Sequence, residues 1–103
     1  MLPLVRDHLD DICVLCKRHG VKSLALFGSA VTSELRRDES DLDFLVEFES
    51  MPPAERARRF FALEADLRSL FGVQIDLGEP EGIRNRRIRT AIERTSIPLY
   101  AAA

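Results

Sequence analysis

The stretch LFGSAVTSELRRDESDLDFLVEF, residues 26–48, decides the fold because it joins two apolar runs through a polar connection. The first run covers residues 22–28, is short, and ends at a glycine, which is typical of a buried strand. The second run, residues 41–48, predicts another strand, partly alternating and partly fully buried. It begins with Asp41 and Asp43 on either side of a leucine, so two carboxylates stand where a core strand would start.

The segments on both sides of this stretch predict helices that alternate with strands. Apolar residues recur at helical spacing from residue 4 to residue 16, and Gly20 is placed to end that helix. Pro98 assigns the last strand to a sheet edge, because proline cannot donate to a central ladder. We expect the remaining elements at residues 29–35 (short helix), 52–71 (helix), 73–78 (strand), 83–94 (helix) and 96–100 (edge strand). This order predicts an α/β or α+β fold, a small mixed sheet of three to four strands flanked by helices.

Length and composition fit one globular domain over residues 1–103, with 46% hydrophobic and 31% charged residues. A formal net charge of −2 provides no chain-wide field that would attract nucleic acid or an anionic membrane. Charged residues interrupt the apolar positions near the N-terminus, and no stretch reaches the roughly 20 apolar residues of a membrane span. We therefore expect a cytoplasmic protein that uses no membrane and no nucleic acid.

The two cysteines, Cys13 and Cys16, have the C-x-x-C spacing of some metal and redox sites. No second cysteine pair completes a zinc site. His8 and His19 flank the pair, but four positions along one helix cannot converge on a tetrahedral ion. We interpret the cysteines as small apolar side chains in a reducing compartment.

The aspartates at the head of the second run have a chemical explanation. Alternate residues of a strand point to the same side, so Asp41 and Asp43 project from one face, roughly 6.5 to 7 Å apart at the backbone. Such a pair disfavours ionisation of both groups unless a cation lies between them, and Mg²⁺ prefers carboxylate oxygens. A third acid would allow two ions about 3.5 to 4 Å apart, and Asp76 is the candidate because it alternates with apolar neighbours. The alternative is that these acids are only solvated strand residues.

The Gly28-Ser29 pair fits phosphate chemistry when it is combined with these acids. A glycine at a strand-to-helix turn lets phosphate approach the backbone, and the following helix offers unpaired N–H groups. Ser29 adds a hydroxyl to this turn. Helix capping by Ser29 is the alternative interpretation, and it is compatible with phosphate binding.

The order of a strand, Gly28-Ser29, a short helix, a strand with Asp41-x-Asp43, and Asp76 on a later strand resembles the DNA polymerase beta-like nucleotidyltransferase superfamily. It is most similar to the minimal nucleotidyltransferases, small proteins that are commonly encoded beside a helical HEPN-domain toxin. The similarity extends over nearly the whole chain, because the C-terminal sequence IRTAIERTSIPLY is also typical of these proteins.

The resemblance implies the polymerase beta-like fold and an enzyme that uses ATP with two Mg²⁺ ions. Gly28 and Ser29 would hold the β- and γ-phosphates. Asp41 and Asp43 would bind both metals, and Asp76 would complete the metal site that activates an incoming hydroxyl. Transfer of AMP would release pyrophosphate. A tyrosine of a HEPN-type partner is the expected acceptor, so the chain would be the antitoxin of a toxin–antitoxin pair.

One departure from the family pattern bears on activity. Family members often continue Gly-Ser with a small residue, an alanine, an arginine and a glycine, whereas residues 30–33 here are Ala-Val-Thr-Ser. The arginine that contacts the triphosphate in the family therefore has no counterpart in this segment. Arg36 or Arg37, in the following loop, would be the candidates to replace it. An inactive module that neutralises a partner by occlusion is the first alternative function, and transfer of a nucleotide to a small molecule is the second.

The last predicted helix is rich in arginine. A solvated helix face or a protein interface is a better interpretation of these arginines than RNA binding, because glutamates lie nearby and the total charge is near neutral. We expect a partner or a second copy of the chain to supply the surface that binds the acceptor.

Overall fold

The computed structural model describes residues 3–27 and 42–102 of the chain. Its helices are α1 (Pro3–Arg6), α2 (Leu9–Arg18), α3 (Pro53–Phe71) and α4 (Arg86–Thr95), with a short 3-10 helix, η2, at Pro80–Gly82. Its strands are β1 (Val21–Phe27), β2 (Leu42–Phe48), β3 (Ile75–Gly78) and β4 (Ile97–Ala101). The short helix expected at residues 29–35 lies outside the described residues.

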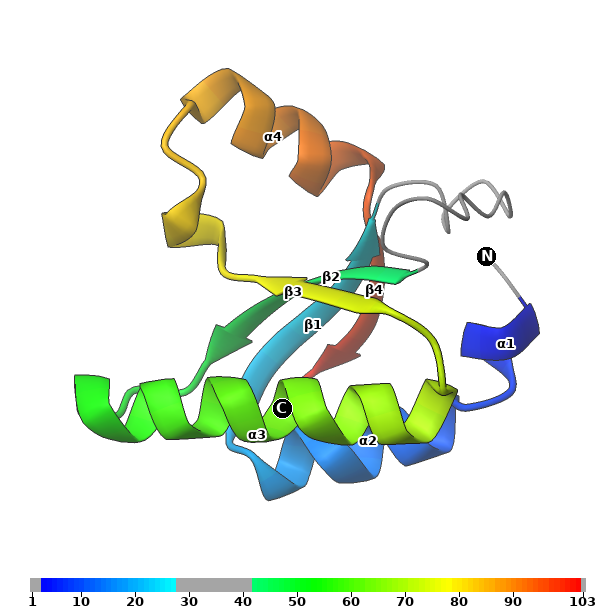
Figure 1. Ribbon diagram of the computed structural model, residues 1–103. Coiled ribbons are helices and arrows are strands. Elements are labelled where there is room, and N and C mark those ends of the chain that lie inside the picture. The colour runs from blue at the N-terminus through cyan, green and yellow to red at the C-terminus, as the bar shows by residue number, and fades with distance from the viewer. Residues whose placement is uncertain (1–2, 28–41, 103) are drawn as a thin grey trace.

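The four strands form one mixed sheet in the order β3-β2-β1-β4. β1 pairs antiparallel with both β2 and β4, whereas β2 and β3 run parallel. β4 is an edge strand, as Pro98 predicted, because proline has no N–H to donate. The mixed sheet flanked by helices confirms the predicted fold class (Figure 1).

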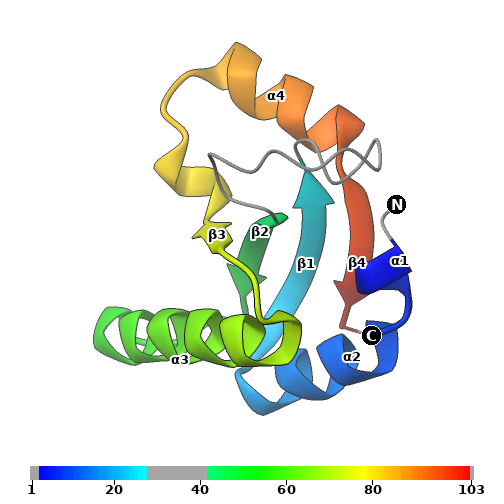
Figure 2. The same ribbon diagram turned by 45° about the vertical axis from the view of Figure 1, so that its right-hand side comes forward.

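The core lies between the sheet and the layer formed by α2 and α3. Along β2, Leu42, Phe44, Val46 and Phe48 are buried, so every second residue of the strand faces this layer. Both ribbon views show α2 and α3 on one side of the sheet and α4 on the other (Figures 1 and 2). Among the described elements, α2 and α3 therefore cover one face of the sheet, and α4 lies on the side of the other face.

The helix α3 forms the main cover of the sheet. Pro53 stands at its first turn, where the missing N–H costs nothing. Leu63, Leu67 and Phe71 form its buried stripe, and each such side chain contributes about 1.5 to 3 kcal/mol by burial. Gly72 ends the helix with a φ of 67°, a conformation that favours glycine, and its N–H donates to the Arg68 carbonyl at 2.8 Å.

The prediction of one continuous N-terminal helix was wrong. The chain forms α1 and α2 with a turn between them, and the His8 N–H donates to the Val5 carbonyl instead of continuing the α-helical pattern. The His8 ring explains the break, because its Nδ1 donates to the Leu4 carbonyl at 2.8 Å, which is the acceptor that the backbone would have used. The predicted end of this region is confirmed, since Gly20 follows α2 with a φ of 68°.

The third strand is shorter than the predicted residues 73–78. Its ladder positions are Ile75–Gly78, and the chain bends at Val73 after it leaves α3. Pairing begins just before the strand, because the Leu42 N–H donates to the Gln74 carbonyl at 3.3 Å.

Across the described part of the chain, none of the helices has the length and apolar character that crossing a membrane requires.

Candidate active site

Two of the predicted acids lie side by side on the sheet. Asp43 of β2 and Asp76 of β3 are register partners in the parallel ladder. Neighbouring strands lie about 4.8 Å apart, and paired positions direct their side chains to the same face. The residues before and after each aspartate are buried, so both carboxylates belong to the face opposite the α2 and α3 layer. The structure thus brings together two acids that are 33 positions apart in the sequence.

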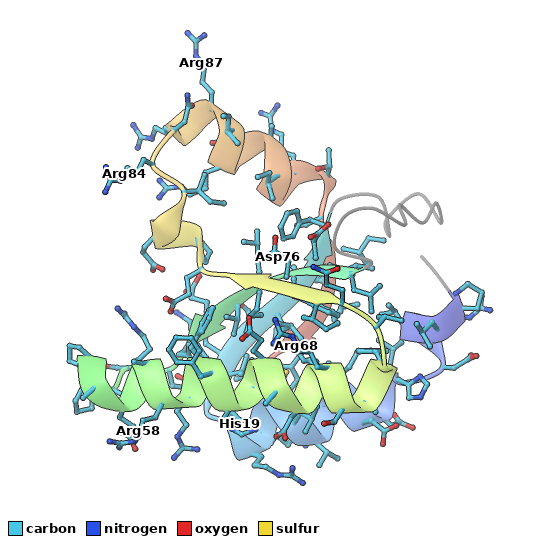
Figure 3. All side chains as sticks on the ribbon, in the orientation of Figure 1. His19, Arg58, Arg68, Asp76, Arg84 and Arg87 are labelled. Carbon is cyan, nitrogen blue, oxygen red and sulfur yellow. The ribbon has the colours of Figure 1, made fainter. Side chains whose placement is uncertain are left out.

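The two carboxylates differ in exposure. Asp43 is half-buried and Asp76 is exposed, and Asp76 lies on the side of β3 away from α3 (Figure 3). Among the residues that the structure describes, Asp76 has no hydrogen-bond or ion-pair partner. A carboxylate without a protein partner is available to a ligand that approaches from solvent.

The C-terminal end of β1 lies beside Asp43 in the sheet. Phe27 is the register partner of Asp43 in the antiparallel ladder, and it is the last described residue before Gly28 and Ser29. These two residues and Asp41 lie outside the described residues. Of the five predicted site residues, the structure therefore places Asp43 and Asp76 next to each other and leaves the other three undescribed.

The oxygen ligands at this position suit a hard divalent cation. Two carboxylates on one face repel each other in water, and a cation between them removes that repulsion. Within residues 3–27 and 42–102, no three acidic, histidine or cysteine side chains converge on a common point. The pair Asp43 and Asp76 supplies two of the three predicted ligands, and Asp41 would be the third.

The face beside the acid pair is apolar, which the sequence reasoning did not single out. Leu45 is the next residue of β2 on this face, it is only 6% exposed, and its register partner is Gly78. A side chain at Gly78 would first contact Leu45 at 3.8 Å, an ordinary packing distance. The sequence signal was the position of Leu45, two residues after Asp43 in an alternating strand.

Glu47 lies further along the same face of β2, but its neighbour there is a lysine instead of an acid. It is two positions after Leu45, and its carboxylate pairs with Lys22 at 3.6 Å. Both side chains of this pair are in contact with solvent, so the ion pair contributes little to stability. Glu47 is therefore a suitable internal comparison for the acids of the candidate site.

The cysteines form no part of this site. Cys16 is buried in the α2 contact with the core, and burial together with the neighbouring Cys13 raises its pKa to about 12. The Cys16 thiol therefore stays protonated at neutral pH and contributes as an apolar group. Cys13 is half-buried, and both thiols are free of disulfides.

Comparisons with known proteins agree with the fold and with the family inferred from the sequence. The sequence profile of the nucleotidyltransferase domain family matches residues 12–98. A Methanocaldococcus jannaschii chain assigned as a protein adenylyltransferase is 38% identical over 84 residues, which are 82% of either chain. The protein adenylyltransferase MntA of Thermococcus cleftensis is 35% identical over 76% of this chain and 75% of its own.

Solved structures show the same arrangement of elements. A structure assigned to a minimal nucleotidyltransferase superposes with a TM-score of 0.68 at 34% identity and covers 91% of both chains. A toxin–antitoxin complex solved with AMP-PNP contains a chain that superposes with a TM-score of 0.64 at 16% identity, over 91% of this chain and 73% of that one. The resemblance inferred from the sequence is confirmed: the chain belongs to the nucleotidyltransferase domain family and is a minimal enzyme of that class.

Proposed function

We propose that the protein transfers AMP from ATP to a hydroxyl group of a partner protein, in a reaction that depends on Mg²⁺. The pairing of Asp43 with Asp76 on the sheet face opposite the α2 and α3 layer is the observation that carries this proposal. The names of the relatives support the acceptor class, because both relatives described above are protein adenylyltransferases by name. The AMP-PNP in the toxin–antitoxin structure supports ATP as the donor.

The predicted site residues would have two roles, metal binding and phosphate binding. Asp41, Asp43 and Asp76 would hold two Mg²⁺ ions, and Gly28 and Ser29 would hold the β- and γ-phosphates. Bound Mg²⁺ would neutralise the charge that develops on the phosphoryl oxygens during displacement. The half-buried position of Asp43 suits a residue that holds phosphate-bound cations, because partial burial strengthens its interaction with them.

Asp76 would be the acid that faces the acceptor. It is the exposed member of the pair, so a hydroxyl that arrives from solvent meets it first. The acceptor oxygen forms a bond to the α-phosphorus, the bond between that phosphorus and the bridging oxygen breaks, and pyrophosphate leaves. The hydroxyl proton passes to a base, for which the Asp76 carboxylate is the nearest protein candidate.

The protein would act as the antitoxin of a toxin–antitoxin pair, with a HEPN-type helical protein as its partner. The relative from Thermococcus is an MntA protein, and the toxin–antitoxin structure shares the fold. Such a partner would present the hydroxyl to the sheet face that carries Asp43 and Asp76. A tyrosine is the expected acceptor, since its phenol is the more easily deprotonated side-chain hydroxyl.

Label transfer tests the proposal. The purified protein is incubated with the product of the neighbouring reading frame, labelled ATP and Mg²⁺, and label on the partner is measured by mass. We expect one or more additions of AMP to the partner, lost in the Asp43→Asn variant and kept in Glu47→Gln, which alters an acid on the same face. Transfer that persists undiminished in Asp43→Asn would rule out the assigned site.

A binding module without catalysis is the second candidate, favoured by the departure at residues 30–33 from the usual family residues. Such a module would neutralise its partner by covering it. An Asp43→Asn protein that still neutralises the partner fully in a growth assay would support occlusion. Loss of neutralisation while the complex still forms would support catalysis.

A further inference from the structure

The segment around α4 concentrates positive charge. Residues 84–94 contain five arginines and one glutamate, a formal charge of +4. Because the whole chain has a net charge of −2, the remaining residues carry −6. The five are Arg84, Arg86, Arg87, Arg89 and Arg94, which we call the α4 arginines. A strong local field therefore exists on a protein that is acidic elsewhere.

The α4 arginines have no charged side-chain partner among residues 3–27 and 42–102. Within the part of the chain that the structure describes, none of them forms an ion pair or donates a side-chain hydrogen bond. By contrast, Arg56, Arg59 and Arg68 of α3 all lie within 3.6 to 3.8 Å of a glutamate. Arg84 and Arg87 project away from the sheet (Figure 3).

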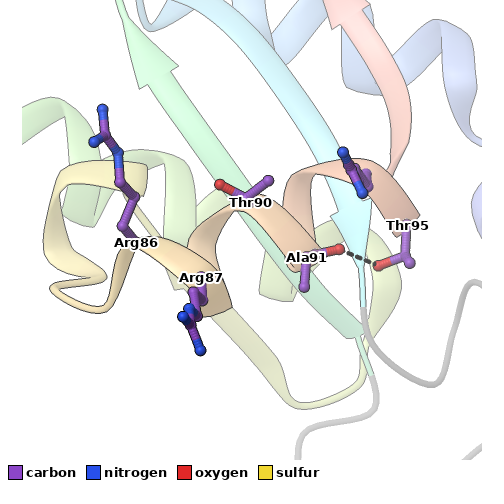
Figure 4. A pocket seen from close by; sticks show the side chains of 6 residues that line it. Arg86, Arg87, Thr90, Ala91 and Thr95 are labelled. Carbon is purple, nitrogen blue, oxygen red and sulfur yellow. Dashed lines mark hydrogen bonds between the residues drawn. The ribbon is translucent and has the colours of Figure 1, made fainter.

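One face of α4 forms a hollow of about 490 Å³ (Figure 4). Its lining residues recur at helical spacing on the exposed side of the helix: Arg86, Arg87, Thr90, Ala91, Arg94 and Thr95. The Thr95 hydroxyl donates to the Ala91 carbonyl at 3.0 Å, which leaves the guanidinium groups as the principal donors of the hollow. The opposite face carries Ile92, which is half-buried.

The chemistry of this surface fits an acidic protein segment that also has apolar side chains. Guanidinium groups bind carboxylates in pairs of hydrogen bonds, and three of them line the hollow. Ile88, 53% exposed on the same helix, adds an apolar contact beside them. Nucleic acid fits less well, because α4 has no aromatic residue on which a base can stack and the rest of the chain would repel a long polyanion.

We propose that the exposed face of α4, centred on Arg86, Arg87 and Arg94, is a docking surface for an acidic, partly apolar segment of the acceptor protein. The inference rests on the proposed function in one respect, since the protein that docks here is the one that presents the hydroxyl. α4 lies on the same side of the sheet as the Asp43 and Asp76 face, so a protein bound to it is held near that site (Figures 1 and 2).

Binding measured without nucleotide tests the surface independently of catalysis. The probe is a fluorescent peptide of about 15 residues with an EEL repeat, and its anisotropy is followed as the protein is added. A peptide with glutamine in place of glutamate and a poly-U RNA of similar length are the comparison probes. We expect binding of the EEL peptide alone, weakened as salt rises, and reduced about tenfold or more by Arg86→Glu, Arg87→Glu and Arg94→Glu together.

A charge-matched variant controls for net charge. Arg6→Glu, Lys17→Glu and Arg58→Glu together change the charge by the same amount at exposed positions, and Arg58 lies on α3, across the sheet (Figure 3). This variant is expected to bind the EEL peptide nearly as well as the unaltered protein. Circular dichroism melting of both triple variants shows whether they fold.

The outcomes separate the two proposals. Equal weakening by both triple variants, equal binding of the glutamine peptide, or tighter binding of poly-U would each overturn the docking surface as stated. Self-association that is lost only with the α4 variant would assign the surface to a second copy and also overturn it. Peptide binding that depends on α4, in a protein that transfers no AMP, would retain the surface and refute the proposed function.

Discussion

Asp76 stands directly beside Asp43 across the parallel ladder of β3 and β2, and Phe27 stands beside Asp43 on its other side. Three segments that are distant in sequence therefore meet at one position of the sheet. Asp43 is the residue common to both pairings, which makes it the centre of the candidate site. Under the proposed function, the exposed carboxylate of Asp76 at this position would face the nucleotide and the acceptor.

The carboxylate of Asp76 is expected to be required for transfer but not for folding. Asp76→Asn keeps the size of the side chain and removes its charge, so a group that holds a cation and accepts a proton is lost. We expect the rate of AMP transfer to fall by roughly 100-fold or more. The circular dichroism spectrum should not change, because Asp76 is exposed and makes no contact with the core. A rate within a factor of three of the unaltered protein would exclude this role.

The same variant is expected to alter the effect of Mg²⁺ on stability. Without the metal, removal of one of two adjacent charges relieves a repulsion of about 0.5 kcal/mol, so Asp76→Asn should melt about 2 to 4 °C higher. With Mg²⁺ at ten times its dissociation constant, the unaltered protein gains about 1.4 kcal/mol and the variant gains less. Differential scanning fluorimetry with and without Mg²⁺ measures both effects, the higher melting temperature without the metal and the smaller gain with it. The Glu47→Gln variant should show neither effect.

The contact between α2 and α3 contains a polar pair that is expected to matter for stability. His19, 7% exposed, approaches the Asp66 carboxylate through its Nε2 at 2.6 Å. Asp66→Ala would leave the His19 ring nitrogen in the core without its partner, at a cost of about 1 to 2 kcal/mol. The measurement is the urea midpoint of unfolding.

Arg18 provides the matched comparison for this pair. It also lies near Asp66, at 3.6 Å, but its side chain is 59% exposed. Arg18→Ala should change the free energy of unfolding by less than about 0.5 kcal/mol, because exposed ion pairs contribute little. A larger effect of Arg18→Ala than of Asp66→Ala would contradict the role given to the buried histidine.

Much of the fold could be predicted from local patterns. The two apolar runs gave β1 and β2, Pro53 and Gly72 bounded α3, and Pro98 placed β4 at an edge. The face that Asp76 occupies on its strand also followed from local information, because strand alternation fixes which face a residue occupies. In each case the interaction that decides the structure lies within a few residues of the position concerned.

What could not be predicted depends on contacts between distant or specific side chains. The break between α1 and α2 comes from one bond of the His8 ring to a backbone carbonyl, which periodicity does not show. His19 and Asp66 are 47 positions apart, and nothing local in the sequence joins them. The strand order and the parallel pairing of β2 with β3 likewise arise from packing of the whole chain.

The buried Cys16 is expected to make stability depend on pH in the alkaline range. Burial and Cys13 raise its pKa from 9.0 to about 12, so the folded protein keeps the proton while the unfolded chain loses it. Stability is then fully present below pH 9 and falls by about 1.4 kcal/mol per pH unit up to about pH 12. Urea midpoints at pH 8, 9 and 10 should decline less steeply in Cys16→Ala than in Cys13→Ala. Parallel declines would show that Cys16 ionises in the folded protein.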